Sequence, residues 1–232
     1  MQQNLTKAWK TMEIKGLREE NCWDYENGFY WFSDTTRINK LLYHFELYKM
    51  ILNVPGDIFE FGVFKGASLI RFCQFRDALE NHYTREIVGF DFYGKFPTDK
   101  VMGASDLNFI ERFENEVGTG ITKEELDDIL NNKGFENYKL IQGNVFDTLD
   151  EYLLEKPELR LSLLHLDMDV AEPTEYVLNT LYERIVRGGL IVIDDYNGVE
   201  GATKVIDEFV KKKNLAIETL SFYGHPVFIK KP

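Results

Sequence analysis

Residues 57–68 read DIFEFGVFKGAS, and this stretch is the strongest indication of the fold. Residues 57–61 have the length and apolar character of a buried strand, and a helix is expected from Gly66 to about Leu79. Gly62 allows the tight turn between them, because glycine adopts backbone conformations that other residues avoid. A buried strand, a glycine turn and a helix in this order are typical of a parallel α/β sheet.

The same alternation of strand and helix continues to the end of the chain. Further strands are expected at 86–91, 138–142, 161–167 and 190–195, with a closing hairpin at 215–221 and 226–230. Helices are expected at 37–51, from Thr122 to Gly134, from Pro173 to Val186 and at 201–212. These apolar strands and intervening helices predict a Rossmann-like α/β fold, a mostly parallel seven-stranded sheet with helices on both faces.

Local signals set several of the expected boundaries. Thr122 and Glu125 have the spacing of a capping box, which begins a helix. Gly188 and Gly189 are expected to end the helix that precedes them, and Gly224 is expected to turn the final hairpin.

The composition indicates one globular domain. The chain has 232 residues, of which 44% are hydrophobic and 14% aromatic, enough for one α/β core. We expect residues 1–52 to form an N-terminal helical cap or lid and residues 53–232 to form the Rossmann-like core. One or both of the aromatic-rich segment 1–36 and the long connection 92–120 are expected to cover the substrate and to contribute to a homo-oligomer interface.

Charge and cysteine content narrow the environment of the protein. A formal net charge of −12 repels phosphate backbones, so nucleic acid is not expected as a partner. We find neither a signal peptide nor an apolar run approaching the roughly 20 residues that span a bilayer, so we expect a cytoplasmic protein without membrane insertion. Cys22 and Cys73 are expected to be free thiols, and no Cys-X-X-Cys motif or His/Cys cluster in the sequence indicates zinc.

The turn after the first strand has the chemistry of a cofactor site. Ligands of such sheets bind at the carboxyl ends of the strands. Gly66 lets the backbone approach a ligand, and the free N–H groups at the start of the helix favour a carboxylate. Glu60 can accept a hydrogen bond from an ammonium, and a carboxylate beside an ammonium is the methionine end of S-adenosylmethionine (SAM). The spacing is not the GxGxxG of dinucleotide sites, so NAD is disfavoured; a plain packing turn is the alternative.

Two further strand ends extend this candidate site. Asp91 ends the second strand, where a carboxylate is expected to bind two ribose hydroxyls. Asn144 follows the third strand and could offer a hydrogen bond to adenine. The alternatives are an Asp that caps the next turn and an ordinary loop Asn, because both residue types favour turns.

Acidic residues follow the fourth and fifth expected strands. Asp167 and Asp169 end one, and Asp194 and Asp195 end its neighbour. Carboxylates this close repel one another unless they are protonated or bridged by a cation. Oxygen ligands without His or Cys suit Mg²⁺, or else Mn²⁺ or Ca²⁺. The alternative is a rim of solvated acids.

Taken together, these motifs resemble a known family. EFGVFKGASL, GFDFYGKFP, GNVFDTL, LDMDVAEPT and GGLIVIDDY follow one another as in the macrocin-type sugar O-methyltransferases, over roughly residues 37–210. The resemblance implies a SAM-dependent methyltransferase fold, a Mg²⁺ requirement and methylation of a deoxysugar hydroxyl. It places the metal ligands at Asp169, Asp194 and Asp195. It places the SAM contacts in the Glu60–Ser68 loop and at Asp91.

The expected cofactor-binding residues can be collected from both lines of reasoning. They are Glu60, Phe61, Gly62, Lys65, Gly66, Ser68, Asp91, Asn144 and Asp167.

The expected reaction needs a base beside the acceptor hydroxyl. A metal held by two neighbouring sugar oxygens lowers the pKa of the hydroxyl and orients it. Asp169 is expected beside the reacting hydroxyl, as a metal ligand and as a candidate base, and His225 in the last hairpin is a second candidate. An exposed turn histidine is the alternative for His225.

The sequence departs from the family at the acceptor side. Residues 92–95 read FYGK where the family often has Ser-Phe-Glu-Gly, and Val170-Ala171 stand where a Tyr is common. These departures concern the acceptor. The composition is rich in Lys, Asn, Ile and Phe, unlike that of antibiotic-producing bacteria with GC-rich genomes, and this favours a nucleotide-linked heptose or deoxyhexose of a bacterial surface polysaccharide. The rival functions are a catechol-type O-methyltransferase, which favours an Asp-Asn pair in place of Asp194-Asp195, and a nucleotide-sugar-binding module without catalysis.

Overall fold

The structure, a computed structural model, describes residues 12–95 and 115–232. The chain divides into two units, Met1–Ile38 and Asn39–Pro232. This division falls inside helix α2 (Thr35–Ile51), not at residue 52, so most of α2 belongs to the larger unit. The described part of the smaller unit contains an antiparallel pair, a short 3-10 helix and one α-helix: β1 (Glu13–Ile14), β2 (Leu17–Arg18), η1 (Glu19–Asn21) and α1 (Cys22–Phe32).

The larger unit is built on a seven-stranded sheet with the order β5-β4-β3-β6-β7-β9-β8. Its strands are β3 (Asp57–Phe61), β4 (Ile87–Asp91), β5 (Tyr138–Gln142), β6 (Leu161–Leu166), β7 (Ile185–Ile193), β8 (Glu218–Leu220) and β9 (Tyr223–Lys230). The first five strands pair in parallel, and β9 pairs antiparallel with both β7 and β8. The Rossmann-like, mostly parallel sheet expected from the sequence is confirmed.

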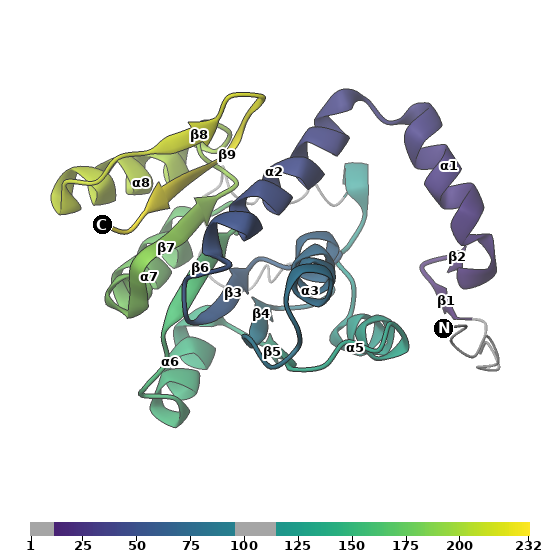
Figure 1. Cartoon of the computed structure of the whole chain (residues 1–232), viewed down its shortest axis with the longest axis horizontal. Helices are drawn as coiled ribbons and strands as arrows, with labels where there is room; N and C mark the ends of the chain where they lie inside the picture. Colours follow the sequence, from purple (N-terminus) through teal and green to yellow (C-terminus); the bar gives the residue numbers. More distant parts are fainter. Residues whose placement is uncertain (1–11, 96–114) are drawn as a thin grey trace. The chain divides into compact units, whose positions relative to one another are not determined.

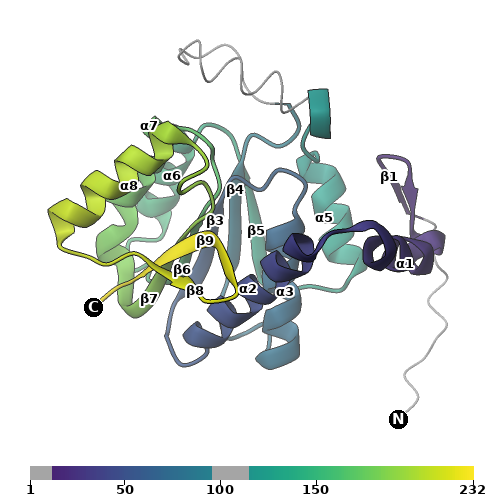
Figure 2. The same cartoon turned by 90° about the horizontal axis from the view of Figure 1, so that it is seen from above.

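Helices cover both faces of this sheet. They are α3 (Ala67–Leu79), α5 (Lys123–Asn132), α6 (Val145–Glu155), α7 (Ala171–Leu181), η2 (Tyr182–Arg184) and α8 (Glu200–Lys213), with α2. Figures 1 and 2 show α6, α7 and α8 on one face and α3 on the other, where α2 also packs. Alternation along β3 explains the two layers, since Phe59 and Phe61 join the core cluster with α6 and α7, whereas Ile58 and Glu60 face the opposite side.

The sequence predicts that Gly188 and Gly189 end the preceding helix, α7, and this prediction is wrong. The helix ends at Leu181, and Gly188 and Gly189 lie inside β7. The register moves from Leu161↔Ile185 to Leu163↔Leu190, so β7 bulges at this point. A Cβ at Gly189 would lie 2.9 Å from the carbonyl oxygen of Val186 and 3.1 Å from that of Ser162. The glycines therefore serve a bulge that lets two backbones pass closely.

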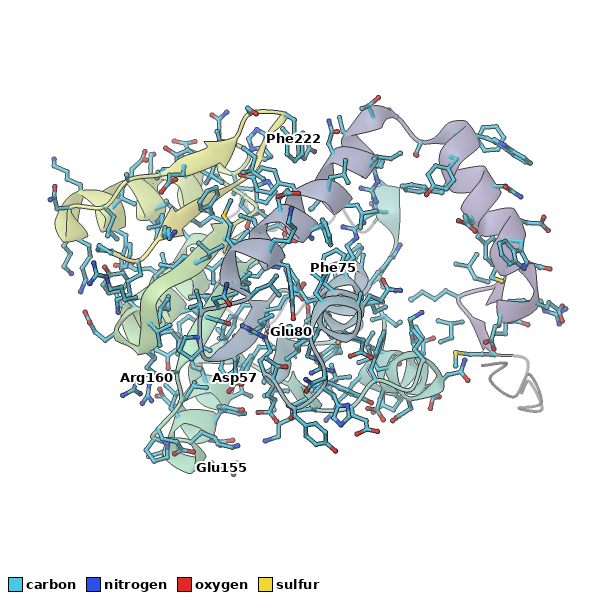
Figure 3. The ribbon with its side chains drawn as sticks, in the orientation of Figure 1. Asp57, Phe75, Glu80, Glu155, Arg160 and Phe222 are labelled. Atoms are coloured by element: carbon cyan, nitrogen blue, oxygen red, sulfur yellow. The ribbon has the colours of Figure 1, made fainter. Side chains whose placement is uncertain are left out.

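Other boundaries also differ from expectation. Helix α6 was not expected, and the β8–β9 turn falls at residues 221–222, which leaves Gly224 inside β9. Figure 3 shows Phe222 at this turn beside α2, its ring centroid 6.1 Å from that of Tyr43. The capping box is confirmed, because the Thr122 hydroxyl accepts from Glu125 N at 3.1 Å and the Glu125 carboxylate accepts from Thr122 N at 2.9 Å.

Two expectations about the chain as a whole can be compared with the structure. Cys22 and Cys73 are both free thiols, as expected. Among the helices within 12–95 and 115–232, none combines the length and the apolar character needed to cross a membrane.

Candidate active site

The carboxyl ends of four neighbouring strands meet at one edge of the sheet. Phe61 of β3 pairs with Phe90 of β4 and Leu166 of β6, and Leu166 pairs with Ile193 of β7. The residues that follow are therefore side by side, which brings Gly62, Asp91, Asp167 and Asp194 to a common edge. Strand β9 begins at the same edge, because it runs antiparallel with Val227 opposite Ile193. Asp57 and Arg160 mark the opposite edge in Figure 3.

Gly62 is where the glycine loop, residues 62–66, and the acidic end of β6 touch. Its φ is +88°, and a Cβ there would lie 1.7 Å from the carbonyl oxygen of Asp167. Gly62 N donates to Phe90 O at 3.0 Å, while Asp167 N donates to Phe61 O at 2.9 Å. The turn is therefore tight for a specific reason: only a residue without a side chain lets the end of β3 pass the end of β6.

Gly66 begins α3 in the left-handed conformation, with φ of +77°. No side chain caps this helix, so the N–H groups of its first turn are left to solvent or to a ligand. A Cβ at Gly66 would lie 2.7 Å from the Leu126 side chain of α5. The glycine is thus needed for packing as well as for a helix start that is open to an anion.

Asp91 holds the shape of the glycine loop. Its Oδ2 accepts from Val63 N at 2.6 Å and from Phe64 N at 2.9 Å, and its Oδ1 accepts from Tyr93 N at 2.7 Å. The turn-capping alternative is therefore seen directly. Contact of Asp91 with a ribose stays a prediction, because each carboxylate oxygen can accept more than one hydrogen bond.

Other expected cofactor residues have structural partners as well. The Phe61 side chain lies in the core, stacked on Phe90 with ring centroids 4.6 Å apart. Lys65 donates to the carbonyl oxygen of Val117, ahead of α5. Asn144 caps α6, because its side chain accepts from the backbone N–H of Phe146 at 3.3 Å. The structure accounts for these side chains without a ligand, and their contacts with SAM stay predictions.

Glu60 faces the interior of the protein. It is fully buried on β3 and accepts a hydrogen bond from the hydroxyl of Ser68. Its Oε1 lies 3.5 Å from Nδ1 of His165, the residue that pairs with it on β6. Burial acts to lower the pKa of His165, but the carboxylates of Glu60, Asp167 and Asp194 together outweigh burial and raise it.

The acidic residues converge as the sequence predicts. Asp167, Asp194 and Asp195 each offer a carboxylate oxygen, and these atoms lie within 4.8 Å of one another. Asp169, the ligand expected from the resemblance, is not in this group of three. It is held beside the group, with φ of +61° and its backbone N–H donating to Asp195 Oδ2 at 2.9 Å.

Burial and mutual repulsion raise the pKa values of Asp167, Asp169 and Asp195. Burial, followed by the charge of Asp194, raises the pKa of Asp167 well above its ordinary value. Burial and the charge of Asp169 raise the pKa of Asp195 to about 8, and burial and the charge of Asp167 raise that of Asp169 to about 6. A divalent cation would remove this repulsion, and carboxylate oxygens fit Mg²⁺ or Mn²⁺.

Lys40 is a member of this site that the sequence did not reveal. Its Nζ lies 2.8 Å from Asp194 Oδ2. Burial acts to lower the pKa of Lys40, but the carboxylates of Asp194 and Asp167 outweigh it and raise the pKa. Asp194 Oδ1 is buried and has no hydrogen-bond partner among the described residues, so one oxygen of this carboxylate is available to a cation.

The remaining expected site residues are less constrained. His225 is exposed at the start of β9, at the same edge as the acids, but it is not grouped with them. Its role as a base stays a prediction. The expected lid segments fall partly on residues 1–11 and 96–114, which lie outside the described residues.

Comparison with known proteins gives a family match over most of the chain. A family model described as macrocin-O-methyltransferase (TylF) matches residues 9–231. A demethyldecarbamoylnovobiocin O-methyltransferase of Streptomyces niveus is 28% identical over 175 residues, which are 73% of this chain and 63% of that protein. An 8-demethyl-8-(2,3-dimethoxy-alpha-L-rhamnosyl)-tetracenomycin-C 4'-O-methyltransferase of Streptomyces olivaceus is 30% identical over 148 residues, 62% of this chain and 54% of that protein. The chain thus spans less than two thirds of either relative.

Solved structures share the fold. The calicheamicin-biosynthesis TDP-rhamnose 3'-O-methyltransferase CalS11 aligns with a TM-score of 0.65 at 24% identity, covering 90% of this chain and 85% of that one. The O-methyltransferase NovP aligns with a TM-score of 0.68 at 24% identity, covering 84% of this chain and 80% of that one.

Proposed function

The chain belongs to the macrocin-O-methyltransferase (TylF) family, and from this premise we propose that it transfers a methyl group from SAM to a sugar hydroxyl with the help of a divalent cation. One observation supports this more than any other. The backbone of Asp167 packs directly against Gly62, so the cofactor loop and the acidic cluster are adjacent. A methyl donor in the loop and a sugar oxygen at the acids would be held within reach of each other.

We assign the methionine end of SAM to the glycine loop. The uncapped first turn of α3 supports this, because its N–H groups suit the cofactor carboxylate. When bound, SAM supplies an activated methyl group on a sulfonium sulfur. The chain's contribution is to fix the loop, and Asp91 does so through the N–H groups of Val63 and Phe64.

We assign the cation, Mg²⁺ or Mn²⁺, to Asp167, Asp194 and Asp195, because their oxygens converge. The cation would lower the pKa of the acceptor hydroxyl that it binds. This leaves Asp169, which lies beside the three ligands, to receive the proton of that hydroxyl. His225 is the alternative base at the same edge.

The acceptor is proposed to be a nucleotide-linked heptose or deoxyhexose of a bacterial surface glycan. The Streptomyces olivaceus relative is named as a methyltransferase of a rhamnosyl group, and this supports a deoxyhexose as the acceptor. Family membership and the Asp194-Asp195 pair favour a sugar over a catechol-type acceptor. A cytoplasmic location and a homo-oligomer belong to the same proposal.

Replacing the acids should separate turnover from cofactor binding. In Asp167→Asn, Asp194→Asn or Asp195→Asn, turnover should fall by about 100-fold or more, which corresponds to about 2.7 kcal/mol of barrier. SAM affinity measured by calorimetry should change by no more than about threefold, because the cation acts on the acceptor. Asn should be tolerated at residue 167, since burial already favours the neutral form of that acid.

Asp128→Asn is the matched control, because Asp128 is exposed on α5. It should keep both turnover and SAM affinity. If the cluster variants lose SAM affinity as steeply as turnover, the acids bind the cofactor and the assignment of the cation fails. If they keep full turnover, the cluster has no catalytic part, and a metal-free methyl transfer is left.

A further inference from the structure

A second group of polar side chains lies beneath α2, and the proposed reaction does not use it. His44 on α2 and His165 on β6 are both fully buried, with ring centroids 5.4 Å apart. Neither ring nitrogen of either histidine has a hydrogen-bond partner among the described residues. Buried polar groups in native proteins are nearly always paired. Of these four ring nitrogens, only His165 Nδ1 has an ion-pair contact within the described residues, with Glu60 Oε1 at 3.5 Å, so the other three require an explanation.

The end of strand β7 adds a carboxylate, that of Asp194, to the same place. Asp194 Oδ1, at the end of β7, is also buried and without a partner in the described part of the chain. His44, His165 and Asp194 each offer one ligand atom, and the three atoms lie within 4.8 Å of one another. Three elements far apart in the sequence thus bring unpaired donor atoms to one point.

The fold explains why these residues meet. Lys40 and His44 are four residues apart on α2, so they lie on the same side of that helix. Lys40 reaches Asp194 Oδ2 at 2.8 Å, which places His44 one turn further along, over His165. His44 is also stacked on Phe72 of α3, with ring centroids 5.5 Å apart. The packing of α2 therefore fixes the His44 ring where it stands.

We propose that His44, His165 and Asp194 bind a divalent transition-metal ion such as Zn²⁺, in a site separate from the all-oxygen cluster. Two imidazole nitrogens and one carboxylate oxygen suit Zn²⁺ or Co²⁺, whereas Mg²⁺ prefers oxygen ligands. Glu60 lies 3.5 Å from His165 Nδ1, and a carboxylate behind a ligating histidine is the usual way in which such a ring is oriented. The two sites share only Asp194, whose Oδ2 also accepts from Lys40 at 2.8 Å.

Neighbouring charges are compatible with a dication here. Two positive charges act here, that of Lys40 next to Asp194 and that of Arg71, which acts on His44 and Lys40. The carboxylates of Glu60, Asp167 and Asp194 all act on His165, so three acids face two cations. The site also differs from a surface acidic patch, because its two nitrogen ligands are wholly buried.

The test uses Co²⁺ as a spectroscopic probe. The full-length protein is stripped with a chelator, saturated with Mg²⁺ to fill the oxygen cluster, and titrated with Co²⁺ until the spectrum stops changing. We expect one Co²⁺ per chain, with visible absorption bands of nitrogen coordination that an equivalent of Zn²⁺ removes. Zn²⁺ should also raise the Tm of the Mg²⁺-saturated protein.

Variants assign the signal to the proposed ligands. His44→Gln and His165→Gln should each weaken Co²⁺ binding by at least about tenfold, following the scale of lost metal contacts. His82→Gln is the matched control, because His82 pairs with Glu136 near the surface and should leave the bands unchanged. Asp167→Asn should weaken Mg²⁺ binding and leave the Co²⁺ bands in place, which separates this site from the proposed catalytic cation.

Two results would overturn the proposal. One is a wild-type protein that binds no stoichiometric Co²⁺ or Zn²⁺ in the presence of Mg²⁺, a result that needs no variant and no folding control. The other is binding by His44→Gln and His165→Gln that equals that of the wild type. Methyl transfer does not enter either readout, so the outcome is independent of the proposed function.

Discussion

Gly62 has no side chain, yet it decides whether the two halves of the site can lie side by side. In Gly62→Ala the new Cβ would stand 1.7 Å from the carbonyl oxygen of Asp167, and φ of +88° would add strain of about 1–3 kcal/mol. We therefore expect a loss of stability of at least that size in urea unfolding, together with weaker SAM binding by calorimetry. Gly28→Ala in α1 is the control, because Gly28 has open space around it and should be neutral or slightly stabilised. Equal behaviour of the two variants would show that the close approach at Gly62 is not real.

Asp195 sets an expected pH dependence of the metal-free protein. Its pKa is raised from the ordinary 3.8 to about 8 by burial and by the charge of Asp169. Between about pH 6.5 and 8 the folded state therefore binds more protons here than the unfolded state, so the free energy of unfolding should fall as pH rises. Mg²⁺ requires the ionised form, so its affinity should rise over the same range and offset the loss.

Urea unfolding with EDTA or with Mg²⁺, at several pH values in that window, measures both effects. Asp195→Asn should flatten the decline seen in EDTA, because it removes the titrating group. A metal-free wild-type protein whose stability rises with pH across the window would show that Asp195 is ionised at lower pH than its surroundings imply.

For individual residues, the sequence was a better guide to which residues lie close together than to which of their atoms make contact. Asp167, Asp194 and Asp195 could be expected together because parallel strands end at one edge. Asp169 lies beside the converging oxygens and not among them, and its backbone has φ of +61°, which no spacing rule reports. Lys40 was not foreseen, because its contact with Asp194 spans more than half of the chain.

At the scale of elements, apolar runs located the strands, and errors arose where glycine had two possible meanings. Gly188 and Gly189 resemble a helix stop, but they form a bulge because β6 passes too closely for a Cβ. The α6 helix left a signal that was not used, since its buried Val145, Leu149 and Tyr152 recur at roughly helical spacing behind the capping Asn144. Packing against the sheet decides both the glycine bulge in β7 and helix α6. Only the helix could have been predicted from the sequence.

The α1 helix supports a prediction about assembly. Trp23, Trp31 and Phe32 are large, and more than two thirds of each side chain is exposed. Exposed apolar groups that cluster on one helix often mark an interface. We expect light scattering to show a homo-oligomer for the full chain and a smaller mass for a chain lacking residues 1–36. Trp31→Ser with Phe32→Ser should reduce the mass without truncation, and equal masses for all three proteins would contradict the prediction.

In the whole molecule, the fold brings the glycine loop, an acidic cluster and a histidine pair together along one sheet. The sequence predicted the first two because each follows a strand end. It could not predict the third, because His44 comes from a helix and His165 from the interior of a strand, and only packing brings them together. Family membership supports methyl transfer as the proposed chemistry, which the fold alone does not do.

The most direct test of the account is methyl transfer itself, measured with labelled SAM and a panel of nucleotide-linked heptoses and deoxyhexoses. We predict transfer to a sugar hydroxyl in Mg²⁺, loss of transfer in EDTA, and recovery when Mg²⁺ is restored in excess. NAD should neither bind nor compete with SAM. Transfer at full rate in EDTA would contradict metal-assisted methyl transfer, because the cluster of Asp167, Asp194 and Asp195 would then be only a rim of solvated acids.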